Sequence, residues 1–264
     1  MQAILEKLYA KRTFGIKPGL TVVSKLMAEL GNPQERLRTI HVAGTNGKGS
    51  VTAMLMSALR ELGLKIGVYT SPHLVRVNER FCINGVEIPD AEFFALLEKV
   101  EQASEILKQR DGLDVTFFEY TTAVAFLWFA EKNVDFAIIE VGMGGRLDAT
   151  NILPPPIVTV ITKIGLDHTA YLGESIAEIA GEKAGIIKRG SALVIGQNPP
   201  EALAVIIKVA QEKGVAFRLA AEDVSIIKNK KASSFNMQQL FVESQSVSYG
   251  NIKLKLPASY QIDN

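Results

Sequence analysis

The chain has 264 residues, of which 47% are hydrophobic and 22% charged, so it can bury the core of one large domain or two small ones. This composition excludes intrinsic disorder, and the net charge of +1 argues against binding nucleic acid through charge. A single cysteine excludes a disulfide scaffold. The apolar stretch at 123–130 is too short to span a membrane, and the first residues lack the apolar core of a signal peptide. We therefore expect a cytoplasmic protein.

Apolar runs alternate with helical patterns along most of the chain. Short runs with β-branched residues predict strands, and apolar residues at helical spacing predict helices. In chain order we expect a strand at 38–43, a helix at 48–62, a strand at 65–69, helices at 91–109 and 119–131, strands at 134–141 and 157–162, a helix at 175–187, a strand at 192–196, a helix at 200–213 and a strand at 216–219. This alternation indicates an α/β fold, in which helices cover both faces of a mostly parallel, P-loop-type sheet.

The pattern changes after about residue 222. The chain then has short strand-like segments, which lie at 224–227, 239–242, 246–249 and 252–254. Polar turns such as 229–234 separate them, which predicts a small antiparallel region. The last residues, 260–264, have the pattern of a helix that is just beginning. We therefore expect one domain over 1–264, with antiparallel strands appended at 222–256.

The sequence GTNGKGS, residues 44–50, follows a predicted strand and opens a predicted helix. In that context a glycine-rich loop is typical of a phosphate site. Glycines let backbone N–H groups converge on phosphate oxygens, and the helix N-terminus adds positive potential. Lys48 would reach the β- and γ-phosphates as a point charge. The plainer interpretation is a tight turn with an exposed lysine, but strand, loop, lysine and hydroxyl all favour the phosphate site.

The loop departs from the usual pattern at one position. In most P-loops a serine or threonine follows the lysine directly and binds Mg²⁺. Here Gly49 follows Lys48, and the hydroxyl comes one place later at Ser50. Some metal ligands are therefore expected to come from elsewhere in the chain.

Three residues at or after the ends of predicted strands are candidates for the metal. Glu140 lies near the end of its strand, and Ser71 and His168 follow theirs. All three would lie at the carboxyl edge of the sheet, where open parallel sheets bind ligands, and oxygen ligands suit Mg²⁺. Each also has a plainer interpretation: a solvated glutamate, a turn-forming serine and a histidine on a surface loop.

Other polar residues are ambiguous when each is taken alone. Asp148, Thr150 and Asn151 follow the glycines of GMGGRLDATN, and they would either line a pocket or form caps and Asx turns. Lys183, on a predicted helix, would by itself be a surface lysine. His41, inside the first strand, is expected in the core or behind the ligands of the site.

Seven motifs occur in a fixed order: GTNGKGS, TSPHL, FFEYTTAVAF, EVGMGGRLDATN, ITKIGLDHTAYLG, EKAGIIK and LKLPASYQIDN. Together they resemble the folylpolyglutamate synthase/dihydrofolate synthase family, which belongs to the Mur ligases. The resemblance runs through essentially the whole chain. The phosphate loop alone would fit any Mur-type ligase, whereas the combination is specific.

The resemblance implies sites for ATP and for two Mg²⁺ ions. ATP would contact Gly44, Thr45, Asn46, Gly47, Lys48, Gly49, Ser50 and Asn264. Ser71, Glu140 and His168 match the ligands of a first Mg²⁺. Lys183 matches a lysine that CO₂ carboxylates and that helps to hold a second Mg²⁺, and a lysine near cations has the lowered pKa that this chemistry needs. The catalytic residues would be Lys48, Lys183 and His168.

The resemblance also implies the substrates and the reaction. The pteroate or folate would contact Phe117, Phe118, Glu119, Tyr120, Arg146, Asp148, Thr150 and Asn151. The reaction would add L-glutamate to dihydropteroate or tetrahydrofolate, with ATP, through an acyl phosphate. The partners would be small molecules, without nucleic acid or membrane, and the chain is expected to be a monomer. For any one of the aromatic residues, a place in the helix core is at least as good an interpretation.

Family members continue into a second α/β domain that carries much of the glutamate pocket, so the chain would be a truncated product or an excised domain. Two other functions stay open. One is a Mur-type ligase of UDP-muramoyl peptides, which the short N-terminus disfavours. The other is a non-catalytic domain that binds nucleotide or folate.

Overall fold

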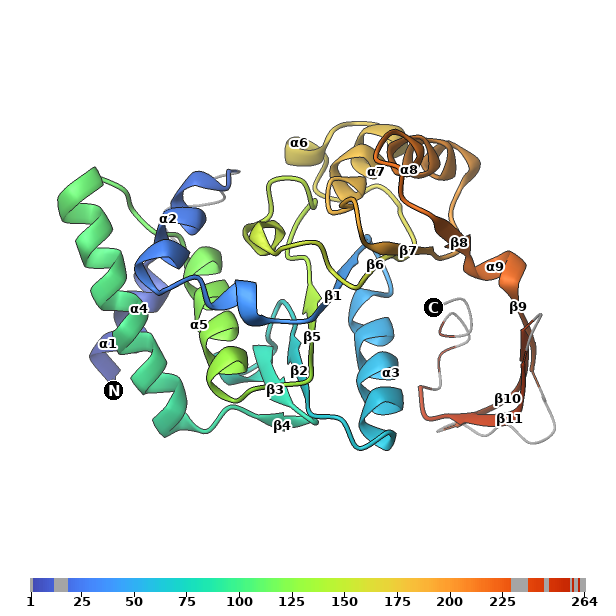
Figure 1. Ribbon diagram of the computed structural model, residues 1–264, viewed down its shortest axis with the longest axis horizontal. Helices are drawn as coiled ribbons and strands as arrows, with labels where there is room; N and C mark the ends of the chain where they lie inside the picture. The colour runs from blue at the N-terminus through green and yellow to red at the C-terminus, as the bar shows by residue number, and fades with distance from the viewer. Residues whose placement is uncertain are drawn as a thin grey trace.

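The computed structural model describes residues 2–11, 19–228, 237–244, 247–256, 258 and 261. Its main feature is an eight-stranded sheet with the order β4-β3-β2-β5-β1-β6-β7-β8 (Figure 1). Strands β2, β5, β1, β6, β7 and β8 run parallel, while β3 and β4 form an antiparallel hairpin at one edge. The strands span Thr39–Ala43 (β1), Ile66–Tyr69 (β2), Phe81–Ile83 (β3), Val86–Glu87 (β4), Phe136–Glu140 (β5), Val158–Ile161 (β6), Ala192–Ile195 (β7) and Phe217–Leu219 (β8).

Helices cover both faces of this sheet, as predicted (Figure 1). Helices α5, α7 and α8 pack on one face, with α1, α2 and α4 on the outer side of α5, and α3 packs on the other face. Their bounds are Gln2–Ala10 (α1), Thr21–Glu29 (α2), Lys48–Glu61 (α3), Asp90–Asp111 (α4), Phe117–Glu131 (α5), Thr169–Leu172 (α6), Ile176–Ala184 (α7), Pro200–Glu212 (α8) and Ala220–Asp223 (α9). Short 3₁₀ helices lie at Pro33–Arg36, Val77–Arg80 and Ala149–Ile152. The α/β fold class is confirmed.

Alternation along each strand divides the core between the two faces. In β5, Ala137 and Ile139 pack against α5, whereas Ile138 packs toward α3. Because both sides of the central strands are buried, their sequences are mostly apolar, which is why the strands could be predicted. None of the helices within the described ranges is both long and apolar enough to cross a bilayer.

A second, three-stranded antiparallel sheet follows the parallel one. It comprises β9 (Val224–Lys228), β10 (Gln238–Ser244) and β11 (Ser248–Leu254), in the order β11-β10-β9. The predicted antiparallel region is therefore present. The separate strands expected at 246–249 and 252–254 are wrong, because β11 continues through Gly250 without a break.

Several elements were not predicted from the sequence. These are the helices α1, α2, α6 and α9, the short 3₁₀ helices, and the hairpin of β3 and β4. The turn expected at 229–234 lies outside the described residues, as do all the residues of 260–264 except Gln261.

Candidate active site

The carboxyl ends of four neighbouring parallel strands bring the predicted residues to one edge of the sheet. β1 leads into the loop 44–47, β2 into Ser71 and β6 toward His168, while β5 ends at Glu140. In the parallel register of β1 and β5, Val42 lies opposite Glu140. The strand that precedes the phosphate loop is therefore the direct neighbour of the strand that carries the candidate carboxylate.

The loop 44–47 is held against the segment that follows β6. Gly44 has a positive φ of 153°, and a Cβ at this position would collide with Oγ1 of Thr162, so only glycine fits. The backbone N–H groups of Thr45 and Asn46 both donate to the carbonyl oxygen of Lys163, at 2.8 and 3.1 Å. These contacts fix the shape of the loop.

Helix α3 begins at Lys48, directly after the loop. Its first intrahelical bond runs from the N–H of Val51 to the carbonyl oxygen of Gly47, at 2.9 Å. The N–H groups of the turn before Val51 therefore have no intrahelical acceptor, which is the arrangement that binds anions at helix N-termini. The ammonium of Lys48 donates to the carbonyl oxygens of Gly44 and Thr45, at 3.0 and 3.2 Å.

Lys183 lies at the other side of the same loop. It comes from α7, is only 3% exposed, and its Nζ donates to the carbonyl oxygen of Gly44 at 2.9 Å. Two ammonium groups, those of Lys48 and Lys183, thus share this one oxygen. Burial, together with the charge of Lys48, lowers the pKa of Lys183 to about 8. Lys183 is therefore not the surface lysine that its helical position alone suggested.

Glu140 is a buried carboxylate next to this cationic loop. It is 4% exposed, and burial raises its pKa to about 7, although the charge of Lys48 and a hydrogen bond from the backbone N–H of Ser71 act in the opposite direction. Glu140 is thus not the solvated strand-end residue of the plainer interpretation. A carboxylate that is buried beside a phosphate loop is suited to a bound cation.

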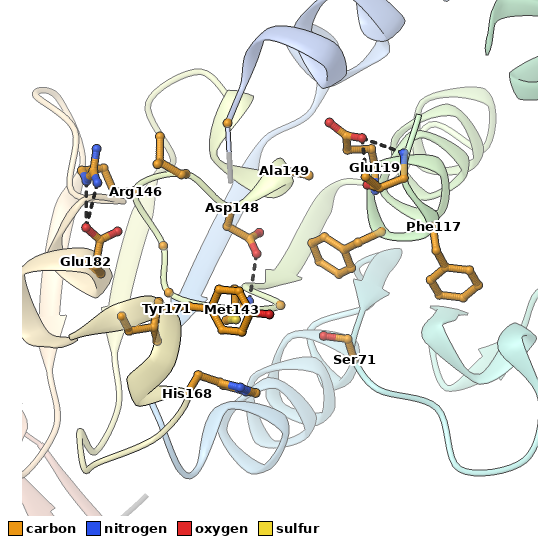
Figure 2. Close-up of a pocket in the computed structure, with 18 of the residues that line it drawn as sticks. Ser71, Phe117, Glu119, Met143, Arg146, Asp148, Ala149, His168, Tyr171 and Glu182 are labelled. Carbon is orange, nitrogen blue, oxygen red and sulfur yellow. Dashed lines mark hydrogen bonds and ion pairs between the residues drawn. The ribbon is translucent and has the colours of Figure 1, made fainter. Parts of the chain in front are cut away.

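Ser71 and His168 both line a cavity, and Figure 2 shows their side chains in its wall. His168 has a left-handed backbone, with φ of 48°, and its side chain is 49% exposed. Among the described residues, the carboxylate next to it is that of Asp167, whose Oδ1 lies 3.7 Å from Nε2. The imidazole is therefore accessible from the cavity.

The donor set fits a particular kind of metal site. Among the described residues, no three His, Cys, Asp or Glu side chains come together as a metal-binding group. Mg²⁺ that is shared with a nucleotide needs only one or two protein carboxylates, because phosphate oxygens and waters complete its shell. Glu140, with the hydroxyl of Ser71 beside the phosphate loop, fits such a shared ion better than a metal enclosed by protein ligands.

The cavity has a volume of about 510 Å³ and is large enough for a drug-sized ligand. Its wall is formed by Gly19, Ser71, Pro72, Arg80, Thr116, Phe117, Phe118, Glu119, Gly142, Met143, Gly144, Gly145, Arg146, Leu147, Asp148, Ala149, His168, Tyr171, Leu172 and Glu182. Most of these residues come from the start of α5, the loop 142–149 after β5, and the segment around α6.

The first turn of α5 supplies the aromatic part of the wall. Thr116 caps this helix, because its Oγ1 accepts from the N–H of Glu119, and the Glu119 carboxylate accepts in return from the N–H and Oγ1–H of Thr116. Phe117 and Phe118 follow the cap directly, and both line the cavity. Figure 2 shows the ring of Phe117. Gly142 is required opposite them, since a Cβ there would collide with the ring of Phe118.

The loop after β5 supplies the polar part of the wall. The Asp148 carboxylate is buried, and it accepts from the N–H of Met143 at 2.9 Å (Figure 2). It also accepts from the N–H and Oγ1–H of Thr150. Burial raises the pKa of Asp148 above its usual range. Arg146, at the other side, is paired with Glu182 through two bonds to Oε1, at 3.0 and 2.8 Å.

Three of the expected substrate residues do not line the cavity, so the structure does not support them as contacts. Tyr120 is 1% exposed, and its hydroxyl donates to the carbonyl oxygen of Leu97 at 2.7 Å. Thr150 bonds to Asp148 and His41 beneath the loop, and Asn151 donates to backbone carbonyl oxygens of the loop and of the segment after α7. These side chains are buried parts of the framework.

Residues 42–264 match the family model described as the Mur ligase middle domain. The chain belongs to the Mur ligase family. Asn264 is the last residue of this match and lies outside the described residues, so its contact with nucleotide stays a prediction.

The similar proteins within this family are folate enzymes. The chain is 43% identical, over 258 residues, to the dihydrofolate synthase/folylpolyglutamate synthase of Bacillus subtilis, and this alignment covers 97% of the chain and 59% of that protein. A solved FPGS–AMPPCP complex matches with a TM-score of 0.92 and 36% identity, covering 99% of this chain and 63% of the other. An FPGS–AMPPCP–folate complex matches with a TM-score of 0.87 and 39% identity, covering 91% and 58%. The chain thus spans less than two thirds of the length of these relatives.

Sequence reasoning missed several cavity residues. Met143 shares a motif with Asp148, and Tyr171 shares one with His168, so the motifs themselves could have indicated that both residues line the site. Arg80 had none, because it follows no predicted strand and belongs to none of the motifs. Only the fold brings it to this cavity.

Proposed function

We propose that the chain is the ATP- and acceptor-binding part of a ligase that joins L-glutamate to dihydropteroate or to a reduced folate. The single observation that carries the proposal is the junction of two features. A phosphate-type loop that Lys48 and Lys183 both contact lies next to Glu140, and Ser71, whose N–H donates to Glu140, lines a cavity with an aromatic wall. The FPGS complexes to which the chain is similar contain AMPPCP alone or with folate, and AMPPCP is an analogue of ATP.

The phosphate loop and the start of α3 would bind the triphosphate. The unpaired N–H groups before Val51 would donate to phosphate oxygens. Lys48 would turn from the carbonyl oxygens of its own loop to the γ-phosphate, where it would balance the negative charge that spreads over the transferring group.

Magnesium ions would be held between the protein and the triphosphate. Glu140, Ser71 and His168 would hold a first Mg²⁺, and Lys183, after carboxylation by CO₂, a second. When bound, these ions would neutralise negative charge on the phosphates and on the acceptor carboxylate. The neutral amine that carboxylation needs is favoured at Lys183, because its pKa is lowered to about 8.

The cavity would take the pterin and benzoyl rings of the acceptor. Phe117 and Phe118 would pack against the rings, and polar groups of the loop after β5, including Asp148 and Arg146, would select their hydrogen-bonding edges. Glu119 would act mainly through the cap that fixes the aromatic turn.

The reaction would proceed in two steps. First, a carboxylate oxygen of the acceptor attacks the γ-phosphorus, the bond to the bridging oxygen breaks, and ADP leaves with that electron pair. Second, the amine of L-glutamate attacks the carbonyl of the acyl phosphate, and the tetrahedral adduct expels inorganic phosphate while the nitrogen loses a proton. ATP is needed because joining a carboxylate and an amine in water is unfavourable.

The proposal extends to the partners, the location and the domain organisation of the chain. The partners would be small molecules only, and the chain would act as a monomer in the cytoplasm. Residues 1–264 would form a single ATP-binding domain, with β9–β11 as an appended sheet, and further glutamate contacts would come from the part of the relatives that the chain does not span.

The decisive experiment measures ADP formation with L-glutamate and either dihydropteroate or a UDP-muramoyl peptide as acceptor. The proposal predicts ADP formation that requires glutamate together with dihydropteroate. Turnover with the nucleotide-sugar peptide instead would indicate a cell-wall ligase. Nucleotide binding without any acceptor-dependent hydrolysis would indicate a non-catalytic binding domain and would reject the ligase proposal for this chain.

A further inference from the structure

The cavity wall contains two arginines in different electrostatic situations. Arg146 is paired with Glu182. Arg80 is only 6% exposed, yet it forms no ion pair with any acid in the described part of the chain. A buried guanidinium that makes no ion pair is costly, so Arg80 is suited to bind an anion that arrives from outside the chain.

The contacts of Arg80 with described residues hold the side chain but use few of its hydrogen-bond donors. Its Nε donates to Nδ1 of His73 at 2.8 Å, and the guanidinium carbon lies 5.3 Å from the ring centroid of Phe117. The terminal Nη groups make no hydrogen bond to a described residue. Because guanidinium presents its donors as a planar fork, these two groups remain able to bind a carboxylate through two parallel bonds.

Arg80 is positioned between the phosphate site and the aromatic wall. It ends the 3₁₀ helix Val77–Arg80, and its carbonyl oxygen accepts from the N–H of Thr70 at 3.0 Å, which ties it to the segment that carries Ser71. On one side it contacts Phe117, and on the other it lies against the backbone of Thr70, next to Ser71, whose N–H donates to Glu140. An anion bound by Arg80 would therefore lie where the cavity meets the candidate metal site.

We propose that Arg80 binds the carboxylate of the acceptor substrate and so aims one of its oxygens at the phosphate site. This inference rests on the proposed function, because it assigns a residue to the group that ATP would activate. The aryl part of the acceptor would extend from the fork along Phe117 into the cavity. A fork that binds the carboxylate in its ionised form also favours the nucleophilic state of that group.

If Arg80 binds the carboxylate, the affinity of the ligand should depend on its acidic group. Calorimetric titration would compare dihydropteroate with its neutral carboxamide, using the full chain in wild-type form and as Arg80→Gln. Hydrogen bonds to a charged group are stronger than neutral ones, so the wild type should bind the acid at least about tenfold more tightly than the amide. In Arg80→Gln this preference should disappear, while the affinity for the amide stays unchanged.

Two further variants control for folding and for charge. Arg80→Lys keeps the charge but not the fork, so it should retain only part of the preference, and it decides the question if Arg80→Gln does not fold. Arg76→Gln removes an exposed arginine of the same segment, which pairs with Asp90 outside the cavity, and should bind both ligands as the wild type does.

The outcomes separate this inference from the ligase proposal. Acid preference that persists in both Arg80 variants, or that is missing in the wild type, overturns the inference. If the preference depends on Arg80 but glutamate never stimulates ADP formation, the carboxylate site stands and the ligase proposal fails alone.

Discussion

His41 lies in the middle of β1, and its imidazole is completely buried beneath the loop after β5. Thr150 gives its hydroxyl proton to Asp148, at 2.5 Å, so its oxygen accepts from Nε2 of His41 at 2.8 Å. This pattern assigns the proton to Nε2 and leaves Nδ1 buried, with no partner in the described part of the chain. A protonated imidazole would therefore be strongly disfavoured, and burial lowers the pKa of His41 to about 3.

The lowered pKa predicts how stability depends on pH. Below the ordinary histidine value of 6.5, the unfolded chain takes up a proton at His41 that the folded chain refuses, so this residue destabilises the fold as pH falls from 6.5 toward 3. His41→Gln keeps a nitrogen for Thr150 but cannot titrate. Between pH 7.5 and pH 5 the wild type should therefore lose about 2 kcal/mol more unfolding free energy than the variant does.

Urea unfolding of both proteins at the two pH values measures this difference directly. The remaining titrating groups are common to both proteins, so they cancel in the comparison. Equal losses of unfolding free energy in the two proteins would mean that folded His41 titrates normally and is not locked in the neutral form.

For single residues, the sequence distinguished side chains that line the cavity from buried framework side chains only in part. The start of α5 was recognised as substrate-binding, but neighbouring positions on a helix point about 100° apart. Phe117 and Phe118 consequently reach the cavity, while Tyr120 turns toward α4 and bonds to its backbone. The place of Arg80 in the cavity wall could not be predicted, because only the fold brings it there and leaves it without an ion pair to a described residue.

Helices α5 and α7 begin with the same capping box, Thr116 with Glu119 and Ser175 with Glu178. The first box holds the turn that carries the aromatic wall, whereas neither residue of the second box lines the cavity. Thr116→Ala should lower the unfolding free energy by about 1 kcal/mol, because a helix N-terminus loses its side-chain acceptor. It should also weaken binding of dihydropteroate, since the turn that presents Phe117 loosens.

Ser175→Ala is the matched control for this prediction. It should cost a similar amount of stability and leave the affinity for dihydropteroate unchanged. Thermal unfolding combined with ligand titration measures both quantities. If the two variants weaken binding equally, the effect is one of general stability, and the cap of α5 has no special part in shaping the cavity.

Element prediction succeeded where burial dictates the sequence. The central strands and the helices that pack on them have continuous or periodic apolar patterns, which is why their positions could be predicted within a few residues. The strand β11 was split in two because it is largely exposed and passes through Gly250, which interrupts an already weak pattern. Helices α1 and α2 are short and were overlooked.

For the molecule as a whole, topology explains why scattered motifs form one site. In a parallel sheet every strand delivers its following loop to the same edge, so residues that are far apart in the chain meet there. This rule predicted that Glu140, Ser71 and His168 would share that edge. It could not predict the burial of Lys183, which depends on α7 packing its Nζ against the phosphate loop.

The central claim is that the loop 44–47 and the start of α3 bind a triphosphate, and titration of the chain with AMPPCP and Mg²⁺ tests it most directly. The exposed Lys99, which pairs with Glu131 on α5, provides the control variant Lys99→Ala. Wild type and Lys99→Ala should bind alike, and Lys48→Ala should bind at least about tenfold more weakly, because a charged contact to phosphate is lost. Unchanged affinity in Lys48→Ala, or a wild-type chain that binds no nucleotide, would contradict the account.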